Sequence, residues 1–264
     1  MGWDGTNGNQ PRELTIIQNF VHELGIWEKQ SSFYFQAKSC QNYIANNIFF
    51  NGPRAGINFN DGFGGGSHIY KNLLFNTCRE SGDHGIWDRQ VYVTNVRYGT
   101  PSVIKAYDEI SYNFMIANYN SQEAVDNDDG SCYYYTHHNF LVYSGNGMKS
   151  DSVDMTTDMT YVGEGFSISD QLAGHNDVFY NNTLVLTSNA QNYGSFDCTS
   201  SQPTWPMLGN NVISTPSGNA SLTGLCNLPL KEFQNKYAID LGSVVQSLPS
   251  DQELLNQATN MIFQ

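Results

Sequence analysis

The sequence predicts an all-β fold, a right-handed parallel β-helix (a solenoid of short stacked strands) with a short C-terminal capping helix. Three observations predict it. An asparagine followed by a short apolar run recurs along the chain, a motif that ends in aspartate follows it, and amphipathic helices are hard to find before residue 245. Short strands between Gly, Asn and Asp corners fit stacked turns better than a sandwich or a propeller.

The asparagines recur at intervals typical of a repeat protein. They are Asn47, Asn72, Asn113, Asn139 and Asn182. Their separations of 25, 41, 26 and 43 residues indicate a turn of 25 residues or so, with extra loops or a turn without its asparagine in the longer intervals. Asparagine tolerates the left-handed backbone of a tight bend, and stacked amides can form a hydrogen-bonded ladder. We therefore expect these residues at the same corner of successive turns.

A second column is predicted 12 to 16 residues after each asparagine, where a small residue and a short stretch lead to aspartate. Its members are Asp61, Asp88, Asp128, Asp151, Asp170 and Asp197. Corner aspartates often serve only to accept hydrogen bonds from turn amides, and the regularity of the column favours that role for most of them.

The chain is predicted to form one domain. Residues 1–245 would be the β-helix, continuing upstream in a longer protein, and residues 246–264 its helical cap. Ser250 is a candidate N-cap, followed by acids in the first turn and apolar residues at helical spacing. No comparable cap precedes the first turn, so a stacking partner is expected at the N-terminal end.

Composition excludes several functions. Acids outnumber bases 25 to 12, giving a net charge of −13, which disfavours nucleic acid and anionic membrane surfaces as partners. No apolar run approaches the roughly 18 residues of a membrane-spanning helix, so membrane insertion is not expected. Sequons at Asn181 and Asn219 favour a secreted, extracellular protein, although the opening residues lack the pattern of a signal peptide.

The five cysteines do not form a C-x-x-C pair, which disfavours zinc and thioredoxin-like chemistry. Most are expected to be buried fillers. Cys198 and Cys226 are the one pair for which we propose a disulfide.

The densest group of candidate catalytic residues is Asp126 to Ser131. If Asp126 and Asp128 face outward from one strand, they lie about 7 Å apart, which suits inverting glycoside hydrolysis. We expect Lys149 and Asp151 beside them on the next turn, with Asp128 and Asp151 about 5 Å apart, near the retaining geometry. Close carboxylates raise the pKa of one member, which then supplies a general acid.

The preceding turn supplies further candidates. Asp83 and His84 are predicted as catalytic residues near Asp88. The predicted substrate-binding residues are Asn58, Asn60, Trp87 and Arg89.

Structural alternatives stand beside these assignments. The aspartates could bind calcium, although the strict D-x-D-x-D-G loop is absent and no other cofactor or metal is expected. Tyr133, Tyr134, Tyr135 and Trp27 could stack on sugars, but strand aromatics more often lie in a core. His137 and His138 cannot both face one way on a strand, which favours simple packing.

Several stretches carry a family resemblance. NIFFNGPRAGINFNDGFGGG, NLLFNTCRESGDHGIWDRQ, DNDDGSCYYYTHHNF and GNGMKSD resemble the right-handed β-helix (pectate-lyase-like) proteins of bacteria, algae and protists. The resemblance implies an extracellular fold shared by polysaccharide hydrolases, lyases and epimerases. Related chains extend further upstream and have a longer segment after Asp-His-Gly, whereas here Gly85 leads directly into Ile86.

The expected function is polysaccharide hydrolysis by paired aspartates, with a polysaccharide as substrate. A non-catalytic structural or adhesive β-helix is the first alternative. A lyase or epimerase is the second, disfavoured because such enzymes need positive charge against a uronate and acids dominate this face.

Overall fold

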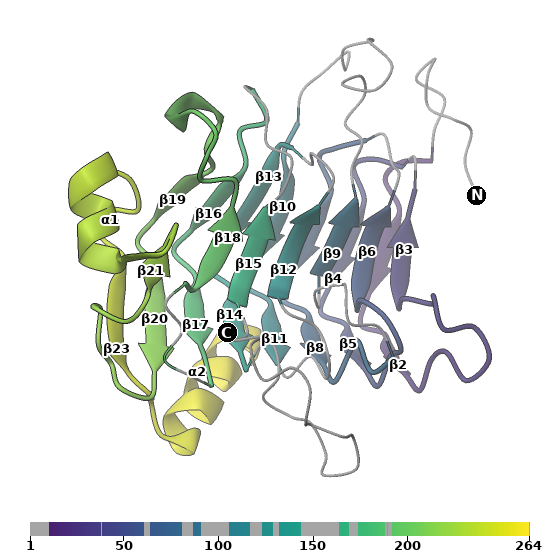
Figure 1. Cartoon of the computed structure of the whole chain (residues 1–264). Coiled ribbons are helices and arrows are strands. Elements are labelled where there is room, and N and C mark those ends of the chain that lie inside the picture. Colours follow the sequence, from purple (N-terminus) through teal and green to yellow (C-terminus); the bar gives the residue numbers. More distant parts are fainter. Residues whose placement is uncertain are drawn as a thin grey trace.

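The computed structural model describes residues 11–37, 39–60, 64–80, 87–90, 106–116, 123–128, 132–143, 164–168, 174–187, 189 and 192–263, with only the backbone of 60, 87–90, 128 and 203. This part is mostly β, with two α-helices, α1 (Leu230–Tyr237) and α2 (Asp251–Phe263). Its three large sheets are parallel and do not close into a barrel, an arrangement compatible with the predicted all-β parallel solenoid (Figure 1).

Each large sheet takes every third strand of the repeating part. The seven-stranded sheet contains β1 (Thr15–Ile17), β4 (Tyr43–Ala45), β7 (His68–Tyr70), β10 (Asp108–Ser111), β13 (Tyr134–His137), β16 (Val178–Tyr180) and β19 (Met207–Gly209). The eight-stranded sheet contains β2 (Phe20–His22), β5 (Ile48–Phe50), β8 (Leu73–Phe75), β11 (Phe114–Ile116), β14 (Phe140–Val142), β17 (Thr183–Val185), β20 (Val212–Thr215) and β23 (Val244–Ser247). The six-stranded sheet contains β3 (Tyr34–Gln36), β6 (Ile57–Asn60), β9 (Trp87–Gln90), β12 (Glu123–Asp128), β15 (Glu164–Ile168) and β18 (Gly194–Phe196). A small antiparallel pair, β21 (Gly224–Leu225) and β22 (Leu228–Pro229), follows near the C-terminal end.

The core lies between the three sheets. In the short strands of the seven- and eight-stranded sheets the middle residue points inward, as with the fully buried Ile44 of β4 and Leu74 of β8. Ile57 of β6 joins them in one apolar cluster that contains residues of all three sheets. Because side chains alternate along a strand, the residues on either side face outward, so the seven- and eight-stranded sheets each have an outer face with two rows of side chains. In β3 and β18 of the six-stranded sheet the middle residue is the more exposed one.

The predicted asparagine ladder is confirmed and is longer than expected, because it also includes Asn19 and Asn211. In each step the Oδ1 of one asparagine accepts a bond from the Nδ2 of the asparagine one turn earlier, at 2.9–3.4 Å. The same Oδ1 accepts the backbone N–H of that residue. The ladder joins the seven- and eight-stranded sheets at their common corner.

The reason given for asparagine at this corner needs a correction. The left-handed residue is the one before each ladder asparagine, with φ between 52° and 57°. These residues are Gln18, Asn46, Lys71, Tyr112, His138, Asn181 and Asn210. The asparagine is therefore needed for its amide, which satisfies backbone groups that the bend would leave without partners.

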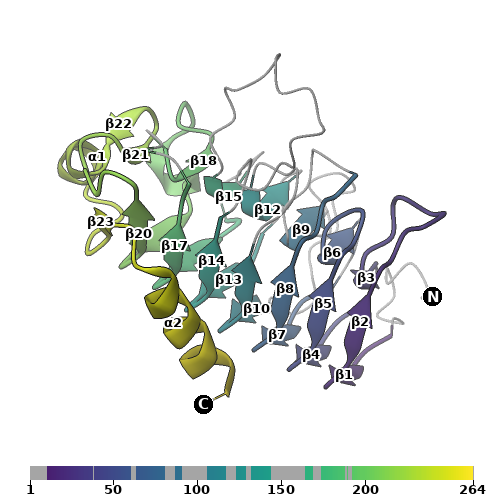
Figure 2. The same ribbon diagram turned by 90° about the horizontal axis from the view of Figure 1, so that it is seen from below.

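The C-terminal helix forms where predicted but does not cap the open end. Ser250 and Glu253 make a capping box, in which the Oγ of Ser250 accepts the N–H of Glu253 and its own N–H donates to the carboxylate. Leu254 and Ala258 pack with Phe114 and Phe140, on the outer face of the eight-stranded sheet (Figure 2). An amphipathic helix is stabilised by the apolar surface it covers, and α2 covers apolar side chains of this sheet face.

The other helix takes the capping position instead. Helix α1 lies at the C-terminal end of the stacked strands and buries Leu230 and Phe233 in the main core (Figure 1). The ring of Phe233 stacks on Trp205 with centroids 6.1 Å apart. Neither described helix is long and apolar enough to cross a membrane.

The predicted disulfide between Cys198 and Cys226 is confirmed, with 5.6 Å between the two Cα atoms. It joins the segment after β18 to the turn between β21 and β22. The other three cysteines, Cys40, Cys78 and Cys132, are buried thiols, as expected of core fillers.

The first turn leaves apolar side chains exposed. Phe20 is 63 % exposed and Phe35 is 53 % exposed, on the edge strands β2 and β3. Such an edge suits the expected stacking partner, which stays a prediction.

Candidate functional site

Most of the predicted site residues fall on or near the six-stranded sheet. Its register aligns six positions in one row, Phe35, Asn58, Asp88, Asp126, Ser167 and Ser195. The adjoining inward row contains the fully buried Ile57, Val125 and Phe166. The row is therefore polar from Asn58 to Ser195, and it begins with the exposed Phe35 on the edge strand β3.

Asp126 is the predicted catalytic residue that the structure describes most fully. Its side chain is 9 % exposed, and that of Asn58, two strands away in the same row, is completely buried. Asp88 lies between them, with its backbone paired to both strands. Two aspartates thus occupy adjacent positions on neighbouring parallel strands.

The predicted aspartate column is wrong in its register. Asp88 aligns with Asp126, whereas Asp128 aligns with Gln90. The strands are aligned by the apolar residues that fill the core, and the distance from those residues to the last aspartate differs between turns. The prediction aligned the turns by their last aspartate, so its alignment of β12 with β9 differs by two residues from the observed register.

The expected neighbours of Asp128 also change. The strand that pairs with β12 on its C-terminal side is β15, which begins at Glu164, so it is not the segment with Lys149 and Asp151. Both of those residues lie outside the described residues, as do Asp83 and His84.

The predicted substrate-binding residues occupy several rows. Trp87 aligns with Ile57 and Val125, which belong to the core, and Arg89 aligns with Phe59. Asn60, at the end of β6, aligns with Gln90. Only Asn58 belongs to the row of Asp126, and the roles proposed for all four stay predictions.

A second pair of acids lies at the beginning of the same strands. Glu123 of β12 aligns with Glu164 of β15. Burial raises the pKa of Glu164, and a side-chain hydrogen bond with Ser195 opposes the increase without cancelling it. A carboxyl group with a raised pKa is suited to donate a proton.

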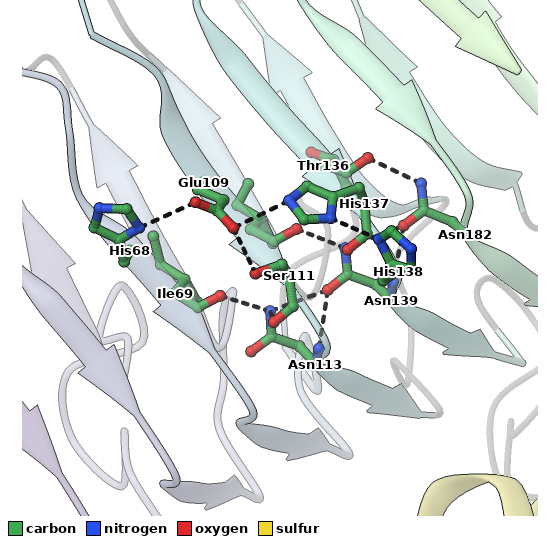
Figure 3. Close-up of polar contacts among 11 residues, drawn as sticks. His68, Ile69, Glu109, Ser111, Asn113, Thr136, His137, His138, Asn139 and Asn182 are labelled. Carbon is green, nitrogen blue, oxygen red and sulfur yellow. Dashed lines mark hydrogen bonds and ion pairs between the residues drawn. The ribbon is translucent and has the colours of Figure 1, made fainter. Parts of the chain in front are cut away.

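The outer face of the seven-stranded sheet holds a polar cluster that the sequence reasoning missed. Glu109 lies between two imidazoles: its Oε2 is 3.1 Å from Nδ1 of His68, and its Oε1 is 3.1 Å from Nε2 of His137 (Figure 3). The hydroxyl of Ser111 donates to the same Oε1 at 3.1 Å. The Nδ1 atoms of His137 and His138 are 2.7 Å apart. We call these five residues the Glu109 cluster.

Its electrostatics are those of a carboxylate held between partners. Partial burial raises the pKa of Glu109, but the bonds with Ser111 and His137 and the charge of His68 outweigh it, so the net pKa is lowered. Burial lowers the pKa of His137, against the opposing effect of Glu109. Glu109 is therefore a carboxylate at neutral pH.

Aromatic rings surround the cluster. The ring of Tyr135 is 4.0 Å from that of His137, and Tyr107 meets Tyr135 edge-on at 6.2 Å. Tyr112 stacks on His138 at 5.0 Å.

The prediction that His137 and His138 face different ways is corrected by these contacts. It assumed strand geometry for both residues, but His138 is the left-handed residue of the bend, with a φ of 52°. The bend turns its ring back toward His137. Glu109 was missed because no local motif marks it, and its partners lie 41 and 28 residues away in sequence.

No group of three or more His, Cys, Asp or Glu side chains in the described ranges could hold a metal ion. The calcium alternative therefore has no described site and stays a prediction.

No protein-family model, curated protein or solved structure matches this chain. The function is therefore argued from the site alone.

Proposed function

We propose that the protein is a secreted, polysaccharide-active right-handed parallel β-helix protein, and that it hydrolyses glycosidic bonds with a pair of aspartates. The observation that carries the proposal is the register of Asp126 beside Asp88 in the polar row of the six-stranded sheet. The residues of the proposed pair are therefore revised from the sequence-based set, in which Asp126 worked with Asp128.

The separation of the two positions suits the chemistry. Neighbouring strands lie about 4.8 Å apart, close to the roughly 5–5.5 Å between the carboxyl groups of retaining glycosidases. One carboxylate would attack the anomeric carbon, and the other would protonate the leaving oxygen and then activate water. Two such groups repel each other's charge, which raises the pKa of one and supplies the acid.

The finer description of the fold belongs to the same proposal. The strands of each large sheet are parallel and come from every third strand of the chain, which supports a β-helix. Parallel crossovers are right-handed in nearly all proteins, which supports a right-handed coil. The disulfide supports an oxidising, extracellular compartment.

A panel of neutral and anionic polysaccharides tests this function through the release of reducing ends. We expect Asp126→Asn and Asp88→Asn each to lower kcat by about a thousandfold or more, since each would remove a group required in the transition state. Asp197→Asn is the matched control, because Asp197 is an exposed aspartate whose Oδ1 accepts bonds from Thr199 of its own turn. Full activity in Asp126→Asn would sink the proposal.

A non-catalytic scaffold is the second candidate, and the burial of the row favours it. Asn58 is completely buried and Asp126 is 9 % exposed, so these two positions of the row present little polar surface to a ligand. A wild type inactive on the whole panel would support the scaffold. Release of unsaturated products, with or without added calcium, would support a lyase instead.

A further inference from the structure

We propose that the outer face of the seven-stranded sheet is a carbohydrate-binding surface for neutral glycan chains, separate from the row of Asp126. The surface consists of Tyr43, His68, Glu109 and Tyr135, with Tyr107 beside them. The inference does not depend on the protein being a hydrolase, because it concerns another sheet and a different set of groups.

The four principal residues form one row. Tyr43, His68, Glu109 and Tyr135 are aligned on the successive strands β4, β7, β10 and β13. Three strand spacings give a row about 14 Å long, enough for several sugar units of an extended chain. Helix α2 covers part of the eight-stranded sheet and makes no described apolar cluster with this row.

The row is accessible to solvent. Tyr43 and Tyr107 are each 40 % exposed, and the side chain of His68 is 54 % exposed. The side chain of Glu109 is 33 % exposed. A ligand can therefore contact both rings and polar atoms without a rearrangement of the strands.

The geometry of the rings favours stacking on a sugar. Tyr107 meets both Tyr133 and Tyr135 edge-on, and an edge-to-face pair covers only one of its four ring faces. On the eight-stranded sheet, by contrast, Phe50 stacks between His22 and Phe75 at 5.0 and 4.6 Å, so both of its faces are covered. Phe20 of the same sheet meets His22 and Phe50 edge-on as well. What distinguishes the seven-stranded sheet is that its edge-to-face rings lie beside the polar groups of the Glu109 cluster.

The polar groups suit hydroxyl groups. Glu109 is fixed by bonds with His68, Ser111 and His137, so its carboxylate is oriented before a ligand arrives. Preorganisation lowers the entropic cost of binding. A carboxylate has about four acceptor sites, so Glu109 can still accept a bond from a sugar hydroxyl, and His68 has a second ring nitrogen for another.

Charge indicates that the ligand is neutral. The described outward strand positions of the seven-stranded sheet include no Lys or Arg, and the row itself carries the carboxylate of Glu109. Lys71, at the bend after β7, has its Nζ over the ring of Tyr70, outside the row. The net charge of −13 adds to the repulsion of an anionic polymer. A neutral polysaccharide is repelled neither by Glu109 nor by the net charge of the protein.

Isothermal titration calorimetry of the whole chain with soluble β-glucan, xylan and galactomannan tests the proposal, with alginate and polygalacturonate as anionic probes. We expect at least one neutral polymer to bind, with an affinity insensitive to salt because no ion pair forms. Tyr43→Ala and Tyr135→Ala should each weaken binding about tenfold, and Glu109→Gln about as much. Phe20→Ala is the matched control, an exposed aromatic on the eight-stranded sheet, and should bind like the wild type.

The proposal is overturned if no neutral polymer binds, if only anionic polymers bind, or if Phe20→Ala weakens binding as much as Tyr135→Ala. Urea unfolding checks the fold of each variant, and Tyr135→Leu, which keeps apolar bulk without a ring, replaces any that is destabilised. Asp126→Asn should bind like the wild type even if it is inactive. Loss of binding in Asp126→Asn would contradict a separate surface, whereas binding by an inactive wild type would contradict only the hydrolase.

Discussion

The asparagine ladder and the Glu109 cluster are both lines of polar side chains that cross several strands, yet they differ in every other respect. The ladder is buried from Asn47 to Asn211, and its asparagines repeat the same amide-to-amide bond from turn to turn. The Glu109 cluster lies on an outer face, and its members change from imidazole to carboxylate to hydroxyl between neighbouring positions (Figure 3).

The difference separates two uses of a polar residue in a stacked fold. A residue that repeats unchanged solves a problem that every turn has, here the backbone groups of a tight bend. A residue that occurs once cannot serve that purpose. Polar groups that break the repeat on an exposed face are therefore the better candidates for binding or catalysis.

The largest effect is expected from a break in the middle of the ladder. Asn113→Ala removes the acceptor of two bonds from Asn72 and three bonds that its own Nδ2 donates. Buried groups left without partners cost about 1–3 kcal/mol each, so we expect a loss of about 4 kcal/mol in the free energy of unfolding. Urea denaturation measures it. Asn189→Ala, at an exposed site with one bond from Ser217, should cost under about 0.5 kcal/mol.

The end of the ladder offers a test by pH. The backbone N–H of Asn211 donates to the hydroxyl of Ser243. The hydroxyls of Ser243 and Tyr193 each donate to the carboxylate of the buried Asp240. Burial raises the pKa of Asp240 from 3.8 to about 6, against the opposing effect of its hydrogen bonds. The folded protein therefore binds this proton more tightly than the unfolded chain, so the contribution is fully present below about pH 4 and is lost as the pH rises through 6.

We expect this loss to be about 3 kcal/mol in the difference between wild type and Asp240→Asn, measured by urea denaturation from pH 4 to pH 7. The comparison with the variant removes the effect of the other carboxyl groups. A difference that stays constant over this range would show that Asp240 does not titrate there.

The smallest effect on stability is expected in the Glu109 cluster. Glu109→Gln should change the free energy of unfolding by less than about 1 kcal/mol at pH 7, because partly exposed ion pairs contribute little. Since the pKa of Glu109 is lowered in the folded state, its contribution is present above the ordinary pKa of 4.5 and is lost at lower pH. A loss as large as that of Asn113→Ala would make the cluster part of the scaffold and erase the distinction between the two regions.

Features that depend on local or repeated chemistry could be predicted from the amino-acid sequence. The five predicted asparagines lie in one ladder, Ser250 begins the last helix, and Cys198 pairs with Cys226. Repetition made the ladder readable, because the same bend in each turn requires the same amide. The mostly β, parallel character of the chain followed from the same pattern.

Which polar residues contact one another depends on how the strands pair in the folded protein. Segments of different length separate the strands, and the register is set by the apolar residues that fill the core, so the sequence could not place Asp88 beside Asp126. Nor could the sequence show that His68 and His137, which are 41 and 28 residues from Glu109, contact its carboxylate. The sequence also could not show that α2 packs on the outer face of the eight-stranded sheet and not on the end of the stacked strands. That position depends on which apolar side chains the folded sheets present.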